Sequence, residues 1–304
     1  MNKVMVTGAT GFVGRHCLPH LAAAGLEVHA VSSRSSPAGG TNVYWHQTDL
    51  LDVERANDLM RQVQPTHLLH LAWHSVPGEF WTSTSNLDWV RASLTLLRAF
   101  ADHGGQRLVV AGSCAEYDWS YGFCSENVTP LSPETLYGIC KHSLWMMMRE
   151  FARQKTLSVA WGRIFHMYGP WEHPDRLVAS VIRAFLRGQP ALCSHGNQIR
   201  DFLYVEDVAE AFVTLLVSNC VGAVNVASGI PVALRDVVHE IGERTGPGHS
   251  AQFGALPVPA NEPRLLVANV SRLADEVGWH PKYPLGAGLD RTVAWWHERL
   301  FSRS

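Results

Sequence analysis

Short apolar runs alternate with amphipathic stretches through the first half of the chain. The apolar runs are bounded by glycine, proline or polar residues and predict strands at 3–7, 27–31, 43–46, 67–71, 108–111 and 158–163. Apolar residues at helical spacing predict helices over 12–24, 53–63, 88–102 and 135–154. Gly25 ends the first of these helices, and Gly104 with Gly105 ends the third.

Strands separated by helices imply parallel pairing through right-handed crossovers. The strands are apolar without alternation, as expected where helices cover both faces of a sheet. We therefore predict an α/β fold, with a doubly wound parallel sheet of the Rossmann type in residues 1–167. Residues 168–304 are less regular and predict a smaller mixed α/β domain. A segment near 198–224, with a strand and helix over 200–217, is expected to return to the first domain.

Composition excludes several classes of protein. The 304 residues carry 25 Lys+Arg and 27 Asp+Glu, a net charge of −2, with no basic cluster to bind nucleic acid. A hydrophobic fraction of 46% with 17% charged residues supports a large core and excludes a wholly disordered chain. The sequence contains no uninterrupted run of about 18 apolar residues, which is the length needed to span a membrane. The apolar stretch that ends at Thr7 is too short for a signal-peptide core.

The cysteines are scattered, with no C-x-x-C pair and no zinc-like quartet. They are Cys17, Cys114, Cys124, Cys140, Cys193 and Cys220. We therefore expect no metal site, and reduced thiols in a cytoplasmic protein.

The junction of the first strand and helix carries a glycine motif, T-G-A-T-G-F-V-G at 7–14. Gly8 allows a tight turn, Gly11 lets the backbone approach a pyrophosphate, and Gly14 lets the helix pack on the strand. The start of the helix offers free N–H groups to phosphates. The motif predicts a dinucleotide cofactor, bound by these glycines with Thr10, Phe12 and Val13. A glycine-rich turn without a ligand is the alternative.

The end of the second strand bears on the choice of cofactor. An acidic residue there would bind the ribose hydroxyls of NAD, but the sequence is V-S-S-R-S at 31–35. Arg34, with Ser33 beside it, could bind a 2′-phosphate, which favours NADP(H) over NAD(H). Arg34 could instead be a solvated loop residue. Asp49 and Leu50 follow the third strand and are expected to meet the adenine.

A second group of residues is typical of acid–base chemistry. Ser113 ends the fifth strand, and Tyr137 and Lys141 follow on one face of a helix because they are four residues apart. A tyrosine, whose ordinary pKa is about 10, is a poor acid–base group at neutral pH. A neighbouring ammonium favours the phenolate, so we expect Lys141 to lower the pKa of Tyr137. Ser113 could hydrogen-bond a substrate oxygen.

These motifs together resemble the extended short-chain dehydrogenases/reductases, specifically the nucleotide-sugar NAD(P)-dependent epimerase/dehydratase family. The resemblance covers nearly the whole length. It includes the glycine motif, H-L-A at 70–72, S-x-x-x-Y at 113–117, L-Y-G-x-x-K at 136–141, Arg163 with Y-G-P at 168–170, R-D-F-L-Y-V-E-D-V-A at 200–209, N-V-A-S-G at 225–229 and V-G-W-H-P-K at 277–282.

The resemblance implies a catalytic triad of Ser113, Tyr137 and Lys141, with Lys141 also holding the nicotinamide ribose. It adds Leu71 and Ala72 to the expected cofactor site. It implies that Arg200 and Arg264 bind the diphosphate of a nucleotide sugar, a role that suits two guanidinium groups. For Arg200, an ion pair with Asp201 or Glu206 is the alternative. His74, Trp81 and Trp171 fall in loops expected to face the cleft, where His74 would contact the substrate.

The chain departs from the family after Ser113. The 4,6-dehydratases of the family carry Asp-Glu where this chain has Cys114 and Ala115, which argues against dehydration. Glu116 is expected to point elsewhere. His166 stands where relatives often carry Asn and could bind substrate. Cys114 and His166 could also form an epimerising pair, although a buried thiol is usually inert. Trp89 replaces a structural Asn of many relatives.

The sequence therefore predicts an oxidoreductase of deoxysugar biosynthesis, an NADP(H)-dependent ketoreductase acting on a nucleotide-diphosphate 4-keto-6-deoxysugar. Hydride would pass to carbon 4, and Tyr137 would donate the proton. A nucleotide-sugar 4-epimerase is the alternative, and a cofactor-binding scaffold without turnover is the alternative of another class. The resemblance also implies a homodimer formed through the helices predicted at 88–102 and 135–154.

Overall fold

A parallel sheet forms the larger part of the molecule. The computed structural model describes residues 2–34, 43–248, 250–259 and 261–302. Over these residues the sheet has seven strands, and every neighbouring pair is parallel, which confirms the predicted fold class. In spatial order the strands are β11 (Gly222–Val226), β7 (Ser158–Ile164), β5 (Arg107–Ser113), β4 (His67–His70), β1 (Lys3–Thr7), β2 (Glu27–Ser32) and β3 (Val43–Gln47).

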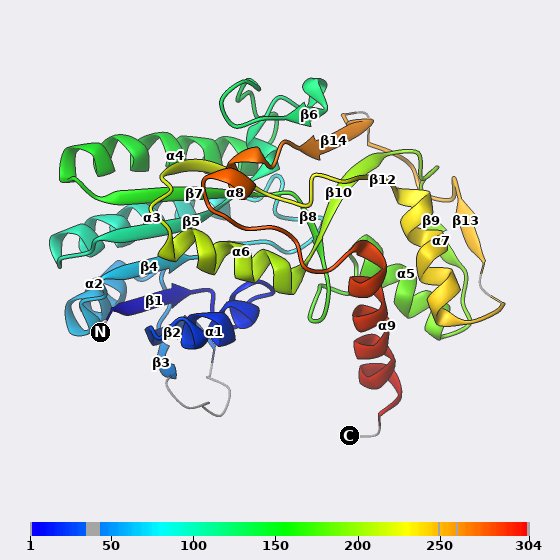
Figure 1. Ribbon diagram of the computed structural model, residues 1–304, viewed down its shortest axis with the longest axis horizontal. Coiled ribbons are helices and arrows are strands. Elements are labelled where there is room, and N and C mark those ends of the chain that lie inside the picture. Colours follow the sequence, from blue (N-terminus) through cyan, green and yellow to red (C-terminus); the bar gives the residue numbers. More distant parts are fainter. Residues whose placement is uncertain (1, 35–42, 249, 260, 303–304) are drawn as a thin grey trace.

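Helices cover both faces of this sheet (Figure 1). Adjacent strand residues point to opposite faces, so Val4 and Val6 join one apolar core and Met5 joins the other. One face is covered by α1 (Gly14–Ala23) and α6 (Val205–Val217), and the other by α2 (Val53–Val63), α3 (Ser85–Asp102) and α4 (Leu136–Lys155).

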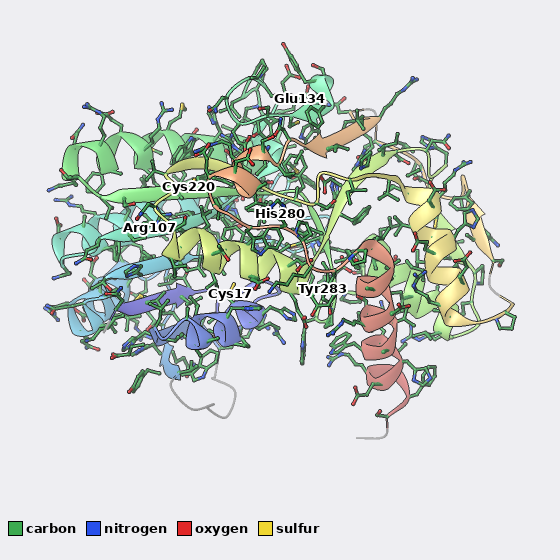
Figure 2. The ribbon with its side chains drawn as sticks, in the orientation of Figure 1. Cys17, Arg107, Glu134, Cys220, His280 and Tyr283 are labelled. Carbon is green, nitrogen blue, oxygen red and sulfur yellow. The ribbon has the colours of Figure 1, made fainter. Side chains whose placement is uncertain are left out.

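Helix α6 and strand β11 return to the large sheet from the second half of the chain. The strand predicted near residue 200 does not return, because it pairs with strands of the smaller sheet. Arg107, buried at the start of β5, donates hydrogen bonds to the carbonyl oxygens of Leu215 (2.6 Å) and Cys220 (2.6 Å). A guanidinium suits this place because the C-terminal carbonyls of a helix carry partial negative charge. Figure 2 labels Arg107 and Cys220 at this end of α6, and Cys17 on α1, whose thiol lies 3.8 Å from the Ala209 carbonyl oxygen.

The remaining elements form a smaller mixed unit. Its sheet contains β12 (Pro231–Ala233), β10 (Ile199–Tyr204), β14 (Leu265–Ala268) and β6 (Phe123–Cys124), with β8 (His166–Tyr168) paired to β10. A third core lies among α5 (Leu177–Leu186), α7 (Leu234–Thr245) and α9 (Leu285–Phe301). The short elements are the 3-10 turns η1 (Cys114–Glu116) and η2 (Trp119–Tyr121), the strand pair β9 (Ala191–Cys193) and β13 (Ala251–Phe253), and helix α8 (Ser271–Asp275).

The six cysteines are all buried and unpaired. Across the described ranges, no helix combines the length and apolar character needed to cross a bilayer.

Candidate active site

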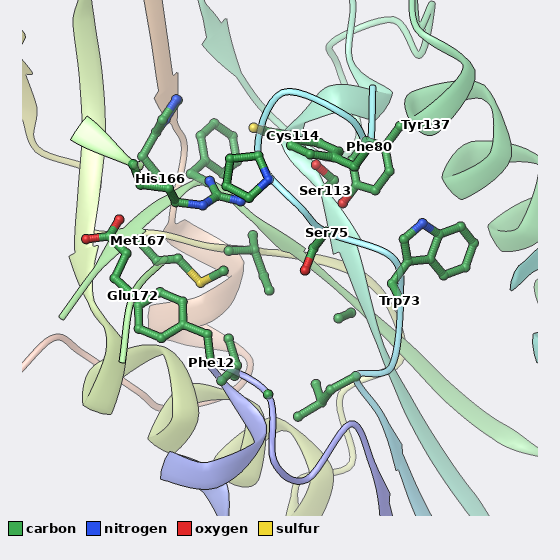
Figure 3. Close-up of a pocket in the computed structure, with 18 of the residues that line it drawn as sticks. Phe12, Trp73, Ser75, Phe80, Ser113, Cys114, Tyr137, His166, Met167 and Glu172 are labelled. Carbon is green, nitrogen blue, oxygen red and sulfur yellow. The ribbon is translucent and has the colours of Figure 1, made fainter. Parts of the chain in front are cut away.

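A cavity of about 490 Å³ lies between the two units, at the carboxyl ends of the parallel strands (Figure 3). Crevices at this edge are the usual ligand sites of doubly wound sheets. In Figure 3, Ser113, Tyr137 and Trp73 lie on one side of the cavity, while His166 and Glu172 lie on the other. The first side belongs to the large sheet and α4, and the second to segments that follow β7.

The glycine loop forms one end of the cavity. Gly8 has a φ of 68°, and a β-carbon there would lie 2.9 Å from the Ala72 backbone nitrogen. A β-carbon on Gly14 would collide with the Gly8 carbonyl oxygen, so helix α1 packs directly on the turn. No side chain caps the start of α1, which leaves N–H groups for phosphate oxygens. The loop therefore fits a dinucleotide.

The predicted cofactor residues divide into two sets. Those in the cavity wall are Gly8, Gly11, Phe12, Val13, Gly14, Leu71, Ala72, Tyr137 and Lys141. Those outside it are Thr10, Ser33, Arg34, Asp49 and Leu50. The Thr10 hydroxyl hydrogen-bonds the Ser32 hydroxyl at 3.1 Å, and Arg34 is exposed. Residue 35 of the motif lies outside the described residues.

Ser113 is held at the end of β5 by a reciprocal cap. Its hydroxyl oxygen accepts a hydrogen bond from the Ala115 N–H (3.1 Å), and the Glu116 carboxylate accepts one from the Ser113 N–H (2.8 Å). The Ser113 and Tyr137 side chains lie beside one another in the cavity wall (Figure 3). The two predicted catalytic hydroxyls thus meet in one wall of the cavity.

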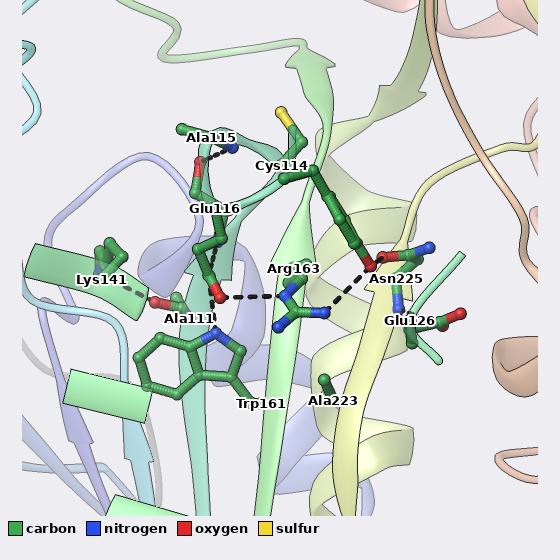
Figure 4. Close-up of polar contacts among 12 residues, drawn as sticks. Ala111, Cys114, Ala115, Glu116, Glu126, Lys141, Trp161, Arg163, Ala223 and Asn225 are labelled. Atoms are coloured by element: carbon green, nitrogen blue, oxygen red, sulfur yellow. Dashed lines mark hydrogen bonds and ion pairs between the residues drawn. The ribbon is translucent and has the colours of Figure 1, made fainter. Parts of the chain in front are cut away.

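Behind this wall lies a buried polar network (Figure 4). The Glu116 carboxylate accepts hydrogen bonds from Trp161 Nε1 (2.8 Å) and Arg163 Nε (3.0 Å). Arg163 also donates to the Tyr117 hydroxyl (3.1 Å), which itself donates to Asn225 Oδ1 (2.8 Å). Glu116 therefore points away from the cavity, as the sequence predicted, and fixes the backbone that carries Ser113.

Tyr137 is enclosed by aromatic rings. The ring centres of Phe80 and Trp81 lie 4.9 Å and 5.8 Å from its own, both edge to face. Burial raises its pKa above the ordinary value. The predicted lowering of this pKa by Lys141 is wrong, because the ammonium lies 5.9 Å from the Tyr137 ring centre and is directed elsewhere.

The Lys141 ammonium has two other neighbours. It donates a hydrogen bond to the Ala111 carbonyl oxygen (2.9 Å), and it lies 3.7 Å from the centre of the Trp73 ring. Burial lowers the pKa of Lys141 to about 7. The cation therefore titrates close to neutral pH.

The opposite side of the cavity carries groups suited to a polar ligand. Burial lowers the pKa of His166 to about 3, and its Nδ1 has no hydrogen-bond partner. Glu172 is 4% exposed, and burial raises the pKa of its carboxyl to about 8 against the opposing effect of Arg176. One of its oxygens, Oε2, is also without a partner. A ligand could satisfy both atoms.

Arg200 lines the cavity and pairs with Glu262, which also lines it. Both alternative partners named from the sequence are wrong, since Asp201 accepts hydrogen bonds from Ser228 and Gly229 instead, and the ion pair of Glu206 is with Arg291.

Three further residues can now be placed. Arg264 and His74 lie outside the cavity wall: the Arg264 side chain is exposed, and His74 lies 3.7 Å from the Glu79 carboxylate. Cys114 does line the cavity, but burial raises the pKa of its thiol to about 12. A protonated thiol is a weak base, which argues against the epimerising pair with His166.

Sequence reasoning missed many residues of the cavity wall, among them Trp73, Phe80, Glu172, Arg176 and Glu262. Trp73 directly follows the H-L-A motif at the end of a strand, so its position alone could have indicated it. Glu172 closely follows Y-G-P. Glu262 lies in an irregular segment with no pattern that would have singled it out.

The sequence model of the NAD dependent epimerase/dehydratase family matches residues 4–227, which include the glycine loop, the Ser113–Tyr137–Lys141 group and the return to the large sheet. The chain belongs to the NAD-dependent epimerase/dehydratase family. The family includes epimerases, dehydratases and dehydrogenases that use a nicotinamide cofactor, and such a cofactor suits the loop described above. Among the residues that the structure describes, no group of three or more His, Cys, Asp or Glu side chains could hold a metal ion.

Curated relatives in the family act on nucleotide sugars. The dTDP-6-deoxy-L-talose 4-dehydrogenase (NAD(+)) of Aggregatibacter actinomycetemcomitans is 28% identical over 248 residues, covering 78% of this chain and 88% of that protein. The CDP-abequose synthase of Salmonella typhimurium is 26% identical over 306 residues, covering 95% of this chain and 97% of that protein.

Solved structures of the family share the fold over nearly the whole chain. MoeE5 in complex with UDP-glucose and NAD is 30% identical, with a TM-score of 0.83 over 98% of this chain and 100% of that one. The Thermus thermophilus UDP-glucose 4-epimerase complex with NAD is 26% identical, with a TM-score of 0.83 over 98% of this chain and 99% of that one.

Proposed function

We propose that this chain is an NADP(H)-dependent ketoreductase that reduces carbon 4 of a nucleotide-diphosphate-linked 4-keto-6-deoxysugar. The observation that carries the proposal is the placement of Ser113 beside Tyr137 in the wall of one cavity, which Lys141 and the glycine loop also line. Cys114 and Ala115 supply no carboxyl group after Ser113, so dehydration lacks its acid there. The talose 4-dehydrogenase among the relatives acts, by its name, on a 6-deoxysugar at position 4.

The residues of the wall suit a proton transfer in the direction of reduction. A bound nicotinamide would supply the hydride. Burial keeps the Tyr137 phenol protonated at neutral pH, which is the state that a proton donor to the developing alkoxide needs. The Ser113 hydroxyl would hydrogen-bond the same carbonyl oxygen, and its capped backbone holds it in place.

The cofactor preference rests on the end of β2. Ser32, Ser33 and Arg34 provide no carboxylate for ribose hydroxyls, and the exposed Arg34 guanidinium could reach a 2′-phosphate. The relatives that name a cofactor name NAD, so both cofactors must be compared.

For the substrate we propose that Arg200 and Arg176 attract the diphosphate, since both line the cavity. The unpartnered His166 Nδ1 and Glu172 Oε2 would contact polar groups of the nucleotide sugar.

The second candidate is a nucleotide-sugar 4-epimerase. The fold match to the Thermus thermophilus 4-epimerase favours it, and the same Ser, Tyr and Lys side chains would serve a reversible oxidation at carbon 4. The two reactions differ in whether the reduced cofactor is consumed.

The test follows NADPH and NADH absorbance while a panel of dTDP-, CDP-, UDP- and GDP-linked 4-keto-6-deoxysugars is offered. Stoichiometric NADPH consumption supports the reductase, and isomer interchange without consumption supports the epimerase. Tyr137→Phe removes the proton donor and should abolish either reaction while the cofactor still binds. Cofactor binding without turnover of any sugar would leave only a scaffold.

We also propose a homodimer formed through α3 and α4, in the cytoplasm. Several apolar side chains on these helices are exposed: Leu87 (57%), Ile139 (46%), Met146 (45%) and Met147 (42%). Exposed apolar side chains gathered on one surface are typical of interfaces. Light scattering that finds only a monomer would reject the dimer.

A further inference from the structure

The Lys141 ammonium lies against the face of an aromatic ring inside the protein. The side chain is 3% exposed, and Nζ is 3.7 Å from the centre of the Trp73 ring. On its other side Nζ donates to the Ala111 carbonyl oxygen at 2.9 Å. A cation over an indole face is attracted by the negative face of the ring, and the attraction grows when both groups are shielded from water.

Other titratable groups near Lys141 offer little compensation for its charge. From α4 it faces Cys140 and Tyr137, from β4 His70, and from η1 Glu116. Burial raises the pKa of Cys140 and of Tyr137 and lowers that of His70 to about 3, so all three are uncharged at neutral pH. The Glu116 carboxylate does favour the cation, but it is already paired with Arg163.

Trp73 is itself fixed in place. Its Nε1–H donates to Asn86 Oδ1 at 2.8 Å. The Asn86 side chain is fully buried, and its amide nitrogen donates to the carbonyl oxygens of Phe80 (2.7 Å) and Ser83 (2.8 Å). Because both amide hydrogens are used, the amide oxygen must face the indole. The ring therefore keeps its face toward Lys141.

We propose that Trp73 is a positioning residue for Lys141: its ring, oriented by Asn86, positions the ammonium at the wall of the active-site cavity and favours its charged form. The proposal rests on the proposed function only in that Lys141 takes part in the reaction. It assigns a role to the residue that follows the H-L-A motif: the ring opposes the loss of charge that burial favours in a lysine without an ion pair of its own.

The direct test titrates Lys141 itself. The chain has four lysines, Lys3, Lys141, Lys155 and Lys282. The protein is labelled with carbon-13 at the Cε atom of every lysine, and the four signals are followed by NMR. The Lys141 signal is the one that is present in all three of the variants Lys3→Arg, Lys155→Arg and Lys282→Arg. Trp73→Leu should lower the Lys141 midpoint by about one pH unit, because the ring attraction is lost. Trp73→Phe keeps a ring and should lower it by less.

Trp89→Leu is the matched control, since its ring lies 6.2 Å from that of Trp73 and is not over the ammonium. It should leave the Lys141 midpoint unchanged. Where Trp73→Leu does not fold, Trp73→Met fills more of the space and takes its place. An unchanged midpoint without the ring, or an equal shift in Trp89→Leu, would overturn the proposal.

The second readout is the pH profile of kcat/KM with the sugar that the substrate panel identifies. The limb that falls as Lys141 loses its proton should move to lower pH in Trp73→Leu, by the same shift as the titration midpoint. A shifted titration in a protein that turns over no sugar would sink the proposed reaction and leave the effect of Trp73 on Lys141 standing. A shifted titration with an unmoved limb would overturn the positioning role.

Discussion

The Arg163 guanidinium lies 3.0 Å from the Glu116 carboxylate, and both side chains are almost completely excluded from solvent. The pair connects β7 to the turn that follows β5, so it joins the core of the sheet to the backbone of Ser113. Glu116 therefore stabilises the edge of the sheet and also fixes the position of the Ser113 hydroxyl in the cavity.

Glu116→Gln should therefore lower both stability and turnover. It leaves the Arg163 charge buried without a counter-charge, which typically costs about 3–5 kcal/mol of unfolding free energy. Chemical denaturation measures the loss. Glu134→Gln makes the same chemical change at an exposed position and should have no effect. Equal stability of the two variants would contradict the role given to the pair.

The Glu172 carboxyl predicts a dependence of stability on pH. Its pKa is raised from 4.5 to about 8 in the folded protein, so between these values the folded state holds a proton that the unfolded chain has released. Stability should fall as pH rises through this window. Glu172→Gln removes the effect and should stabilise the protein at pH 7 by up to about 3 kcal/mol.

Denaturation of wild type and Glu172→Gln at a series of pH values between 5 and 8 checks this prediction. Glu134→Gln again serves as the control, since an exposed carboxyl has no such burial to relieve. If the unfolding free energies of wild type and Glu172→Gln change with pH by the same slope, burial does not raise the pKa of the Glu172 carboxyl and the prediction is wrong.

Arg34 should decide the choice between the two cofactors. Replacement by Ser removes a guanidinium that could bond a 2′-phosphate, so NADPH affinity should fall about tenfold while NADH affinity is unchanged. Fluorescence titration with both cofactors measures this. Arg98→Ser, at an exposed position on α3, is the control. Tighter NADH than NADPH binding by the wild type would show that the preference is reversed.

The Arg200–Glu262 pair makes a prediction about the diphosphate. Because Glu262 already neutralises Arg200, a diphosphate must compete with this carboxylate. Glu262→Gln should strengthen the binding of dTDP or UDP about tenfold, and Arg200→Met should weaken it. Calorimetry measures both, with the exposed Glu243→Gln as control. Weaker binding by Glu262→Gln would mean that the carboxylate itself holds the ligand.

The sequence predicted six of the seven strands of the large sheet because each of them is a short apolar run between polar or glycine boundaries, but it missed β11. Helix α2 falls at its predicted bounds, Val53–Val63, where the buried residues recur at helical spacing. Helix α3 begins at Ser85, three residues before the predicted start. The hydrophobic pattern missed this first turn because its buried residue, Asn86, is polar. The glycine loop and the Ser113–Tyr137–Lys141 group come from local spacing, which the sequence shows directly.

What the sequence could not show are the partners that folding brings from far along the chain. Glu262 reaches Arg200 across 62 residues. Phe80 and Trp81 enclose Tyr137, so burial rather than the neighbouring lysine sets the direction of its pKa. Trp73 takes the place beside Lys141 that the spacing of the helix had given to Tyr137.

A stack of three side chains crosses the junction of the two units. Arg15 donates a hydrogen bond to the Thr10 carbonyl oxygen of the glycine loop (2.5 Å), and its guanidinium lies 4.0 Å from the centre of the Trp171 ring. Arg299, on the last helix, lies 5.1 Å from the same ring. The last turn of α9 therefore packs, through Trp171 and Arg15, against the glycine loop. Removal of this turn would weaken the support of a loop that lies near the opposite end of the sequence.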